Sequence, residues 1–470
     1  MQQPSSLAFR DNAKAALDDE GLQRALAMAK GGFQNKRQMA ATNLPEFDSL
    51  RDAAKALKDH TLAHLDLYLE RFEQEATQQG AVVHWARDDA EARAIILNIC
   101  REAGAKAVTK SKSMVSEEIG LNEALETANI QPVETDLGEH IIQLAGEKPS
   151  HIIAPAFHVT KDKVSDLFAE HHQRERVDEP EALLGEARSY LRDKYFQADV
   201  GITGANFLIA ESGSIVLVTN EGNAELTQGL PKVHIALTGI EKVIPTLDDA
   251  FLMLRILARS ATGQEFSTYT TLLTGPKRAH DQDGPEAFHI VLLDNGRSAM
   301  LGTHFQDMLR CIRCGACMNH CPVYLATGGH AYGWVYPGPM GAVLTPNFIG
   351  IDQAHHLPNA STFCGRCEEV CPMHIPMPKM MRHWREDQFQ KRLTPPTARY
   401  GLAIWAFFAK RPGLYHLTAR AVMATLGFLG RVQGRFRWLP LAGGWTKSRD
   451  MPAPTGTTFQ AAWQKQRERQ

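Results

Sequence analysis

Seven of the eight cysteines of this chain lie between residues 311 and 371, and this clustering constrains the fold more than any other feature. The first run, CIRCGACMNHCP at 311–322, has the spacing C-x₂-C-x₂-C-x₃-C-P, which is typical of bacterial ferredoxins. The second run, STFCGRCEEVCP at 361–372, keeps the last three cysteines and the proline but has Ser361 in the first place. Cysteines crowded in this way indicate a metal site, whereas a disulfide framework would spread them through a secreted fold.

Iron–sulfur clusters explain this spacing better than zinc does. A zinc ribbon uses C-x₂-C pairs and gives the proline-terminated step of three residues no role. In the ferredoxin pattern, three cysteines of a run bind one cluster and the fourth reaches the other cluster. We therefore expect two [4Fe–4S]-type clusters, one bound by Cys311, Cys314, Cys317 and Cys371 and the other bound by Cys321, Cys364 and Cys367.

Ser361 leaves the second cluster one thiolate short. The fourth iron could be bound by the serine oxygen, by another side chain or by an exogenous ligand, or it could be absent. His320, His330 and His374 lie near the runs, although isolated histidines in such places are more often surface or hydrogen-bonded residues. An oxygen ligand or an open corner weakens the hold on this iron, so we expect the second cluster to become [3Fe–4S] on mild oxidation.

The 470 residues are too many for one ordinary domain, and the hydrophobic share of 44% is that of a globular protein. Apolar residues at helical spacing predict a helical segment at 1–78. Residues 79–295 alternate between short β-prone runs and helical ones, which predicts an α/β domain built on a largely parallel sheet. We expect an α-helical, two-cluster ferredoxin-like domain at 296–385 and a basic, aromatic, helical extension at 386–470.

Polar residues at the ends of the predicted strands are candidate ligand-binding residues. Ligands bind at the carboxyl ends of strands in open α/β sheets, so these residues could line a pocket for an anion or a nucleotide-like molecule. Turn formation and helix capping are the alternative roles. The candidates are Lys110, Lys112, Ser113, Glu134, Asp136, Glu211, Asn220 and Asn223. The remaining cysteine, Cys100, lies among isoleucines of a predicted helix and is expected to be a buried structural thiol.

Charge and hydropathy limit the partners. A net charge of -2 gives no reason to expect a nucleic acid. The N-terminus has no secretory signal pattern and no apolar stretch reaches the length of a membrane span, so we expect a cytoplasmic protein. The basic extension and the segment before it carry interleaved aromatic residues such as Trp384, Trp405 and Trp438. This composition predicts helices packed around the clusters, or contact with a partner protein or the inner face of the membrane.

The two cysteine runs, together with KSKSMVSEEIGLNEAL, ETDLGEHIIQLAGEKPSHIIAPAFH and GITGANFLIAESGSIVLVTNEGN, resemble the lactate utilisation protein B family along nearly the whole chain. The resemblance implies an α/β domain shared by lactate utilisation proteins B and C, similar to CoA-transferase and ribose-phosphate-isomerase-like folds. This domain would be fused to an α-helical ferredoxin module. Family members lack the leading cysteine of the second run as well, so Ser361 follows the family pattern.

The resemblance also implies work with proteins A and C in oxidising L-lactate to pyruvate. We therefore interpret the chain as the iron–sulfur electron-transfer subunit of that system, with an electron acceptor that the sequence does not specify. Two alternatives remain at this stage. The α/β domain could itself catalyse chemistry on lactate or a thioester, or the chain could be an iron–sulfur scaffold without turnover.

Overall fold

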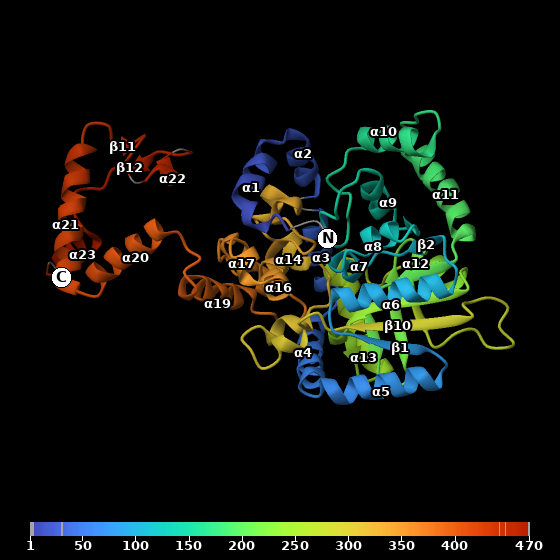
Figure 1. Cartoon of the computed structure of the whole chain (residues 1–470). Helices are drawn as coiled ribbons and strands as arrows, with labels where there is room; N and C mark the ends of the chain where they lie inside the picture. The colour runs from blue at the N-terminus through green and yellow to red at the C-terminus, as the bar shows by residue number, and fades with distance from the viewer. Residues whose placement is uncertain (1–3, 30–31, 441, 447, 469–470) are drawn as a thin grey trace. The chain divides into compact units, whose positions relative to one another are not determined.

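The computed structural model describes residues 4–29, 32–440, 442–446 and 448–468, and the chain divides into two compact units, residues 1–388 and 389–470. The larger unit is built on a six-stranded sheet in the order β1-β10-β7-β4-β2-β3, in which all neighbouring strands are parallel (Figure 1). These strands are β1 (Val82–Ala86), β2 (Ala107–Lys110), β3 (Gln131–Glu134), β4 (Val200–Thr203), β7 (Val233–Gly239) and β10 (Ala287–Leu293). The predicted parallel α/β domain is therefore confirmed.

Helices cover both faces of this sheet, because successive residues of a strand point to opposite sides. On β10, Val291 and Leu293 pack in one core with α6 (Asp89–Glu102), whereas Ile290 and Leu292 pack in a second core with α5 (Leu65–Gln78). Figure 1 shows α6 and α5 on either side of β1 and β10. Cys100 is fully buried in the first core, as expected, and burial raises its pKa to about 12.

A smaller sheet, in the order β8-β5-β6-β9, completes the α/β region. Its strands are β5 (Phe207–Ile209), β6 (Ser214–Thr219), β8 (Val243–Ile244) and β9 (Tyr269–Leu273). The apolar run SIVLVTN forms β6, which pairs antiparallel with β5 and β9. At the β5–β6 turn Gly213 has φ +65°, and a side chain there would meet the backbone of Ala76 at 2.1 Å. Only glycine fits this close approach to α5.

The helices of the α/β region begin where the sequence offers side-chain caps. Thr246 and Asp249 form a reciprocal capping box at the start of α13 (Leu247–Ala261). Ser113 and Asp136 cap α7 (Met114–Glu118) and α9 (Leu137–Leu144). The other helices are α4 (Phe47–Ala63), α8 (Leu121–Thr127), α10 (Lys161–His172), α11 (Pro180–Gln197) and α12 (Asn223–Gly229).

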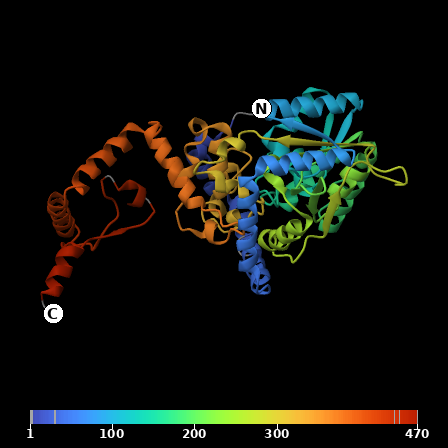
Figure 2. The same ribbon diagram turned by 90° about the horizontal axis from the view of Figure 1, so that it is seen from below.

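The first helices of the chain pack against the segment that carries the cysteines, about 300 residues later. They are α1 (Phe9–Asp18), α2 (Glu20–Ala29) and α3 (Gly32–Thr42). The rings of Phe9 and Tyr332 lie 5.2 Å apart, and the Gln34 side chain donates to the carbonyl of Asn319 at 2.8 Å. Figure 2 shows these dark blue helices beside the yellow and orange ones. The N-terminal helices are thus part of the support for the cysteine segment.

The cysteine segment contains short helices joined by turns. These are α14 (Ala316–Asn319), α15 (Tyr324–Thr327), α16 (Gly338–Ile349), α17 (Ile351–Ala354), α18 (Arg366–Glu369) and α19 (Met377–Gln390). Trp384 of α19 is 8% exposed, stacks on Phe305 at 4.0 Å and donates to the carbonyl of Val343 at 3.1 Å. It therefore belongs to the core of this segment and is not one of the exposed aromatic residues of the basic extension.

The second unit contains α20 (Pro396–Ala409), α21 (Pro412–Leu429), α22 (Gly443–Thr446), α23 (Phe459–Arg467) and a two-stranded sheet of β11 (Arg435–Phe436) and β12 (Met451–Pro452). None of the residues of α20 and α21 is buried. Within the described parts of the chain, the helices are all too short or too polar to cross a lipid bilayer.

Candidate functional site

The two cysteine runs have the same backbone shape. Arg313 and Phe363, each placed one residue before a cysteine, have φ of +60° and +54°. Gly315 and Gly365, each placed one residue after that cysteine, have φ of +72° and +80° and precede α14 and α18. Left-handed backbone is uncommon outside glycine, so its recurrence at Arg313 and Phe363 marks a constrained loop. Ser361 consequently holds the place in the second loop that Cys311 holds in the first.

Backbone N–H groups donate to the cysteine sulfurs at matching places in both loops. Cys314 accepts from Ala316, and Cys364 accepts from Arg366, which is also two residues further along. Both later cysteines accept from two N–H groups, those of Val323 and Tyr324 at Cys321 and those of Met373 and Ile375 at Cys371. Such N–H···S bonds favour negative charge on sulfur, and around an iron–sulfur cluster they tune its reduction potential.

The thiols fall into two neighbouring groups according to which of them interact electrostatically. The pKa of Cys314 is raised mainly by burial and then by Cys371 and Cys311, and Cys317 is affected by the same three cysteines. The pKa of Cys367 is raised mainly by burial and then by Cys321 and Cys364. A weaker influence of Cys367 on Cys317 joins the two groups.

Burial differs most between Cys364 and the other cysteines of the runs. It raises the pKa of Cys314 to about 12 and that of Cys371 to about 11, and both side chains are inside the protein. Cys364, by contrast, is exposed, and the N–H donor of Arg366 lowers its pKa. Buried thiols bind metal only as thiolates, so binding of iron must release their protons. Cys311 and Cys317 of the first group are partly buried and Cys321 and Cys367 of the second group are buried, so Cys364 is the one exposed thiol of the seven.

The Ser361 hydroxyl accepts a hydrogen bond from the backbone N–H of Phe363 at 3.1 Å. The three histidines near the runs also have partners of their own. His320 bonds the carbonyl of Ala316 at 2.9 Å, His330 bonds that of Lys148 at 2.7 Å, and His374 lies 3.2 Å from the carboxylate of Asp52.

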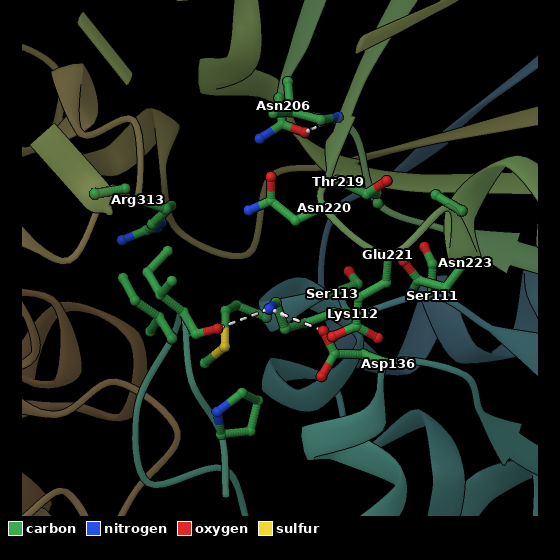
Figure 3. Close-up of a pocket in the computed structure, with 18 of the residues that line it drawn as sticks. Ser111, Lys112, Ser113, Asp136, Asn206, Thr219, Asn220, Glu221, Asn223 and Arg313 are labelled. Atoms are coloured by element: carbon green, nitrogen blue, oxygen red, sulfur yellow. Dashed lines mark hydrogen bonds and ion pairs between the residues drawn. The ribbon is translucent and has the colours of Figure 1, made fainter. Parts of the chain in front are cut away.

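A cavity of about 480 Å³ lies at the carboxyl edge of the parallel sheet. The segments that follow β2, β3 and β4 line it, as expected for an open α/β sheet. In Figure 3, Lys112 is bonded to Asp136, and the amide groups of Asn206 and Asn220 lie across the cavity. Lys112 Nζ lies 3.0 Å from Asp136 and donates to the carbonyl of Ile153 at 3.0 Å.

Five of the eight polar candidates line this cavity, namely Lys112, Ser113, Asp136, Asn220 and Asn223. The other three have structural roles. Lys110 is 1% exposed and forms a 2.6 Å ion pair with Glu134, and Glu211 accepts from the first N–H of α13 at 2.6 Å. Lys110 and Glu134 are buried and bonded to each other, and Glu211 is exposed and caps α13, so all three contribute to the fold outside the cavity.

The first cysteine loop forms one wall of the cavity. Ile312 and Arg313 line it, and a side chain at Gly315 would lie 3.2 Å from Ile153 on the α/β side. Lys242, which follows β7, lines the same end of the cavity. The sequence could not identify Lys242 or Arg313 as cavity residues. They lie about 70 residues apart in the chain and come together only when the cysteine loop packs against the α/β region.

A buried network of charges fixes this wall against the α/β region. Arg297 is 1% exposed and contacts Glu118 at 2.8 Å and Glu241 at 2.7 Å. Arg313 of the cysteine loop lies 3.6 Å from Glu241 and 4.6 Å from the ring centre of Tyr336, whose hydroxyl donates to Glu118 at 2.6 Å. Despite burial, the neighbouring cations lower the pKa of Glu241 to about 2. The network therefore holds the loop through two shared carboxylates.

The second unit presents apolar and basic residues together. Residues 389–470 contain 14 Lys and Arg residues but only two Asp and Glu residues. Large apolar side chains of α20 and α21 are exposed, namely Tyr400, Leu402, Ile404, Trp405, Phe407, Tyr415, Leu417, Val422, Phe428 and Leu429. Helices that are apolar around their circumference are normally covered in a functional assembly.

Comparison with known proteins gives matches along the whole chain. Residues 69–293 match the LUD domain family, and residues 307–375 match the 4Fe-4S dicluster domain family. The chain is 40% identical to "Lactate utilization protein B" of Oceanobacillus iheyensis over 97% of this chain and 96% of that protein. It is 40% identical to the protein of the same name from Bacillus velezensis, with 98% of each chain covered. The "Uncharacterized electron transport protein YkgF" of Escherichia coli is 39% identical over 98% of this chain and 97% of its own length.

Proposed function

Because this chain belongs to the lactate utilisation protein B family, we propose that it carries electrons through two iron–sulfur clusters during oxidation of L-lactate to pyruvate. It is an iron–sulfur component of lactate utilisation, as its relatives and its dicluster domain show. The observation that carries the electron-relay proposal is the repeated cysteine loop, in which each run contributes to both groups of thiols.

In this proposal Cys311, Cys314, Cys317 and Cys371 bind the first [4Fe–4S] cluster. Cys321, Cys364 and Cys367 bind the second, whose fourth corner is open or has a ligand other than cysteine. The electrostatic grouping of the thiols supports this division. Since Cys371 follows Cys367 by four residues, the clusters lie close enough to exchange electrons.

The proposed domains are a helical segment at 1–78, an α/β domain at 79–295, the two-cluster domain at 296–385 and the basic extension at 386–470. For the α/β domain we propose a CoA-transferase-like or ribose-phosphate-isomerase-like fold. Its parallel sheet with a ligand-sized cavity at the carboxyl edge supports this assignment.

Lactate utilisation proteins A and C are the proposed partners, and the second unit is proposed to contact the inner face of the membrane. The excess of basic over acidic residues in the second unit, combined with exposed aromatic and aliphatic side chains, matches an anionic lipid surface.

Co-sedimentation with phosphatidylglycerol vesicles should exceed that with phosphatidylcholine vesicles. Arg431→Glu with Arg437→Glu should abolish the difference, whereas Lys161→Glu in the larger unit should preserve it. Equal sedimentation with both lipids would favour a protein partner for this surface.

Catalysis by the α/β domain is the second candidate function, because the cavity is walled by the first cysteine loop. The experiment that separates the two functions is anaerobic addition of L-lactate to the cluster-loaded chain, alone and with proteins A and C. An electron-transfer component is reduced only with its partners, whereas an enzyme is reduced alone.

A further inference from the structure

The end of the cavity nearest the cysteine loop carries an uncompensated positive charge. Lys242 and Arg313 line this end, and the buried Arg297 lies next to them. Among the described residues, the carboxylates that pair with this group of cations are those of Glu118 and Glu241. Both carboxylates already bind Arg297, so they do not balance all three cations. A buried charge without a partner is unfavourable, and such a group in a cavity is suited to an ionic ligand.

Lys242 is the group without a partner. It is 7% exposed and lines the cavity, yet within the described part of the chain its ammonium group makes no hydrogen bond or ion pair. Lys112, in contrast, is bonded to Asp136, and Lys58 donates to the carbonyls of Glu241 and Val243 at 2.5 and 3.2 Å. The free ammonium group of Lys242 is therefore available to an anion in the cavity.

The remaining walls of the cavity are mainly apolar. They include Ile152, Phe157, Leu217, Leu237 and Leu257. The volume of about 480 Å³ is in the range that holds a molecule of tens of atoms, and it is far larger than a three-carbon acid requires. Burial of an apolar body against such walls contributes to affinity in proportion to its area.

We propose that this cavity binds an organic anion larger than lactate, with its acidic group held by Lys242 and Arg313. Its apolar body lies against the side chains of Ile152, Phe157 and Leu257. The bound anion then lies beside the loop of Cys311 and Cys314, and its charge acts on the first cluster. Binding deepens the proposed electron-transfer function by adding a ligand that senses or sets the potential of that cluster.

A matched set of probes tests the ligand class. Octanoate and octyl phosphate share one apolar chain with 1-octanol but differ from it in charge, and L-lactate and inorganic phosphate have charge without the chain. Isothermal titration with the cluster-loaded protein should show binding of octanoate or octyl phosphate at least tenfold tighter than binding of the other three. The stronger of these two ligands identifies a carboxylate or a phosphate as the acidic group. Octanol binding as well as octanoate, or L-lactate binding as tightly, would overturn the proposal.

Variants test the proposed contact. Lys242→Met should weaken binding of the octyl anion at least tenfold, and Lys242→Arg should largely restore it, which excludes misfolding as the cause. Lys232→Met is the matched control, because Lys232 is exposed on the same domain, and it should bind as the unaltered protein does. Undiminished binding by Lys242→Met would contradict the proposed site.

The redox readout depends on the proposed function, whereas the titration does not. A bound anion should lower the midpoint potential of the first cluster by removing positive charge from its surroundings. If Lys242 serves only to balance the negative charge of the first cluster, Lys242→Met shifts the midpoint potential of that cluster but none of the probes binds, and the proposal fails. If the protein holds no redox-active cluster but binds the octyl anion, the proposed function fails and the site stands.

Discussion

Ser361 occupies the position in the second loop that corresponds to Cys311 in the first, with matching left-handed backbone at the second residue after each. Its hydroxyl is already bonded to the N–H of Phe363. We therefore expect the fourth iron of the second cluster to lack a serine ligand, and this iron should leave first on oxidation.

Ser361→Cys should suppress formation of the [3Fe–4S] state, because it places a thiol where the first loop has one. In Ser361→Ala, the second cluster should convert to the [3Fe–4S] state as it does in the unaltered protein. Ferricyanide titration followed by electron paramagnetic resonance measures the three-iron signal. An undiminished signal in Ser361→Cys would show that position 361 does not reach the cluster.

His234 predicts how the stability of the folded chain depends on pH. It is 1% exposed, bonds Thr203 at 2.8 Å and stacks on Phe288, and burial lowers its pKa to about 3. The unfolded chain therefore binds one more proton than the folded chain between pH 6.5 and 3. Stability from this group is complete above pH 6.5 and decreases as the pH falls, by about 1.4 kcal/mol at pH 5.5.

His234→Gln keeps a polar partner for Thr203 but does not titrate in this range. Urea unfolding followed by circular dichroism at pH 7.5 and pH 5.5 should show a smaller loss of stability in this variant, by about 1.4 kcal/mol. An identical loss in both proteins would mean that His234 is accessible to protons in the folded state.

At the scale of elements, the loops joining the runs to their helices decide which cysteines share a cluster. Cys371→Ala should remove the same spectroscopic signal as Cys311→Ala, and Cys321→Ala should affect the same signal as Cys364→Ala. Mössbauer or paramagnetic resonance spectra of the four variants make the comparison. Loss of one signal by both Cys371→Ala and Cys364→Ala would reject the crossed arrangement.

The cysteine loop is attached to the α/β region through Glu241, which is shared by Arg297 and Arg313. Glu241→Gln should lower the free energy of unfolding by about 3–5 kcal/mol, because it leaves the buried Arg313 guanidinium without a carboxylate and Arg297 with Glu118 alone. The exposed pair of Asp166 and Arg176 is the control, and Asp166→Asn should cost about 0–1 kcal/mol. Equal effects of the two changes in urea unfolding would show that the network does not fix the loop.

Local patterns in the sequence predicted several of these elements correctly. The strand AFHIVLLDN and the cap at Thr246 follow from apolar patterning and capping chemistry alone. The apolar pattern of SIVLVTN is that of a strand, but its place in a separate sheet depends on antiparallel pairing with β9, about 50 residues later. Glu241 and Arg313 have no local signal, since their roles arise only when distant segments meet.

At the scale of the whole molecule, the sequence predicted the parallel α/β domain and the cavity at the edge of its sheet, but not the wall formed by the cysteine loop. Nor did it predict that the N-terminal helices pack against the cysteine segment, as Phe9 does against Tyr332. These contacts join residues hundreds of positions apart, and apolar spacing within a helix identifies its buried face without identifying its partner.

The proposed clusters require iron. Protein purified without oxygen should contain about 7 to 8 iron atoms per chain, from two clusters of three or four irons each. Metal analysis measures this directly, and zinc in place of iron in such a preparation would contradict the assignment of the seven cysteines.

Rapid-freeze paramagnetic resonance during lactate oxidation tests the electron-transfer function most directly. The iron-loaded chain is mixed anaerobically with proteins A and C and L-lactate, with omission of each partner as a control. We expect reduced cluster signals to appear only in the complete mixture and to disappear when an artificial acceptor is added. Clusters that dithionite reduces but that stay oxidised throughout lactate turnover in the complete mixture would contradict the proposed function.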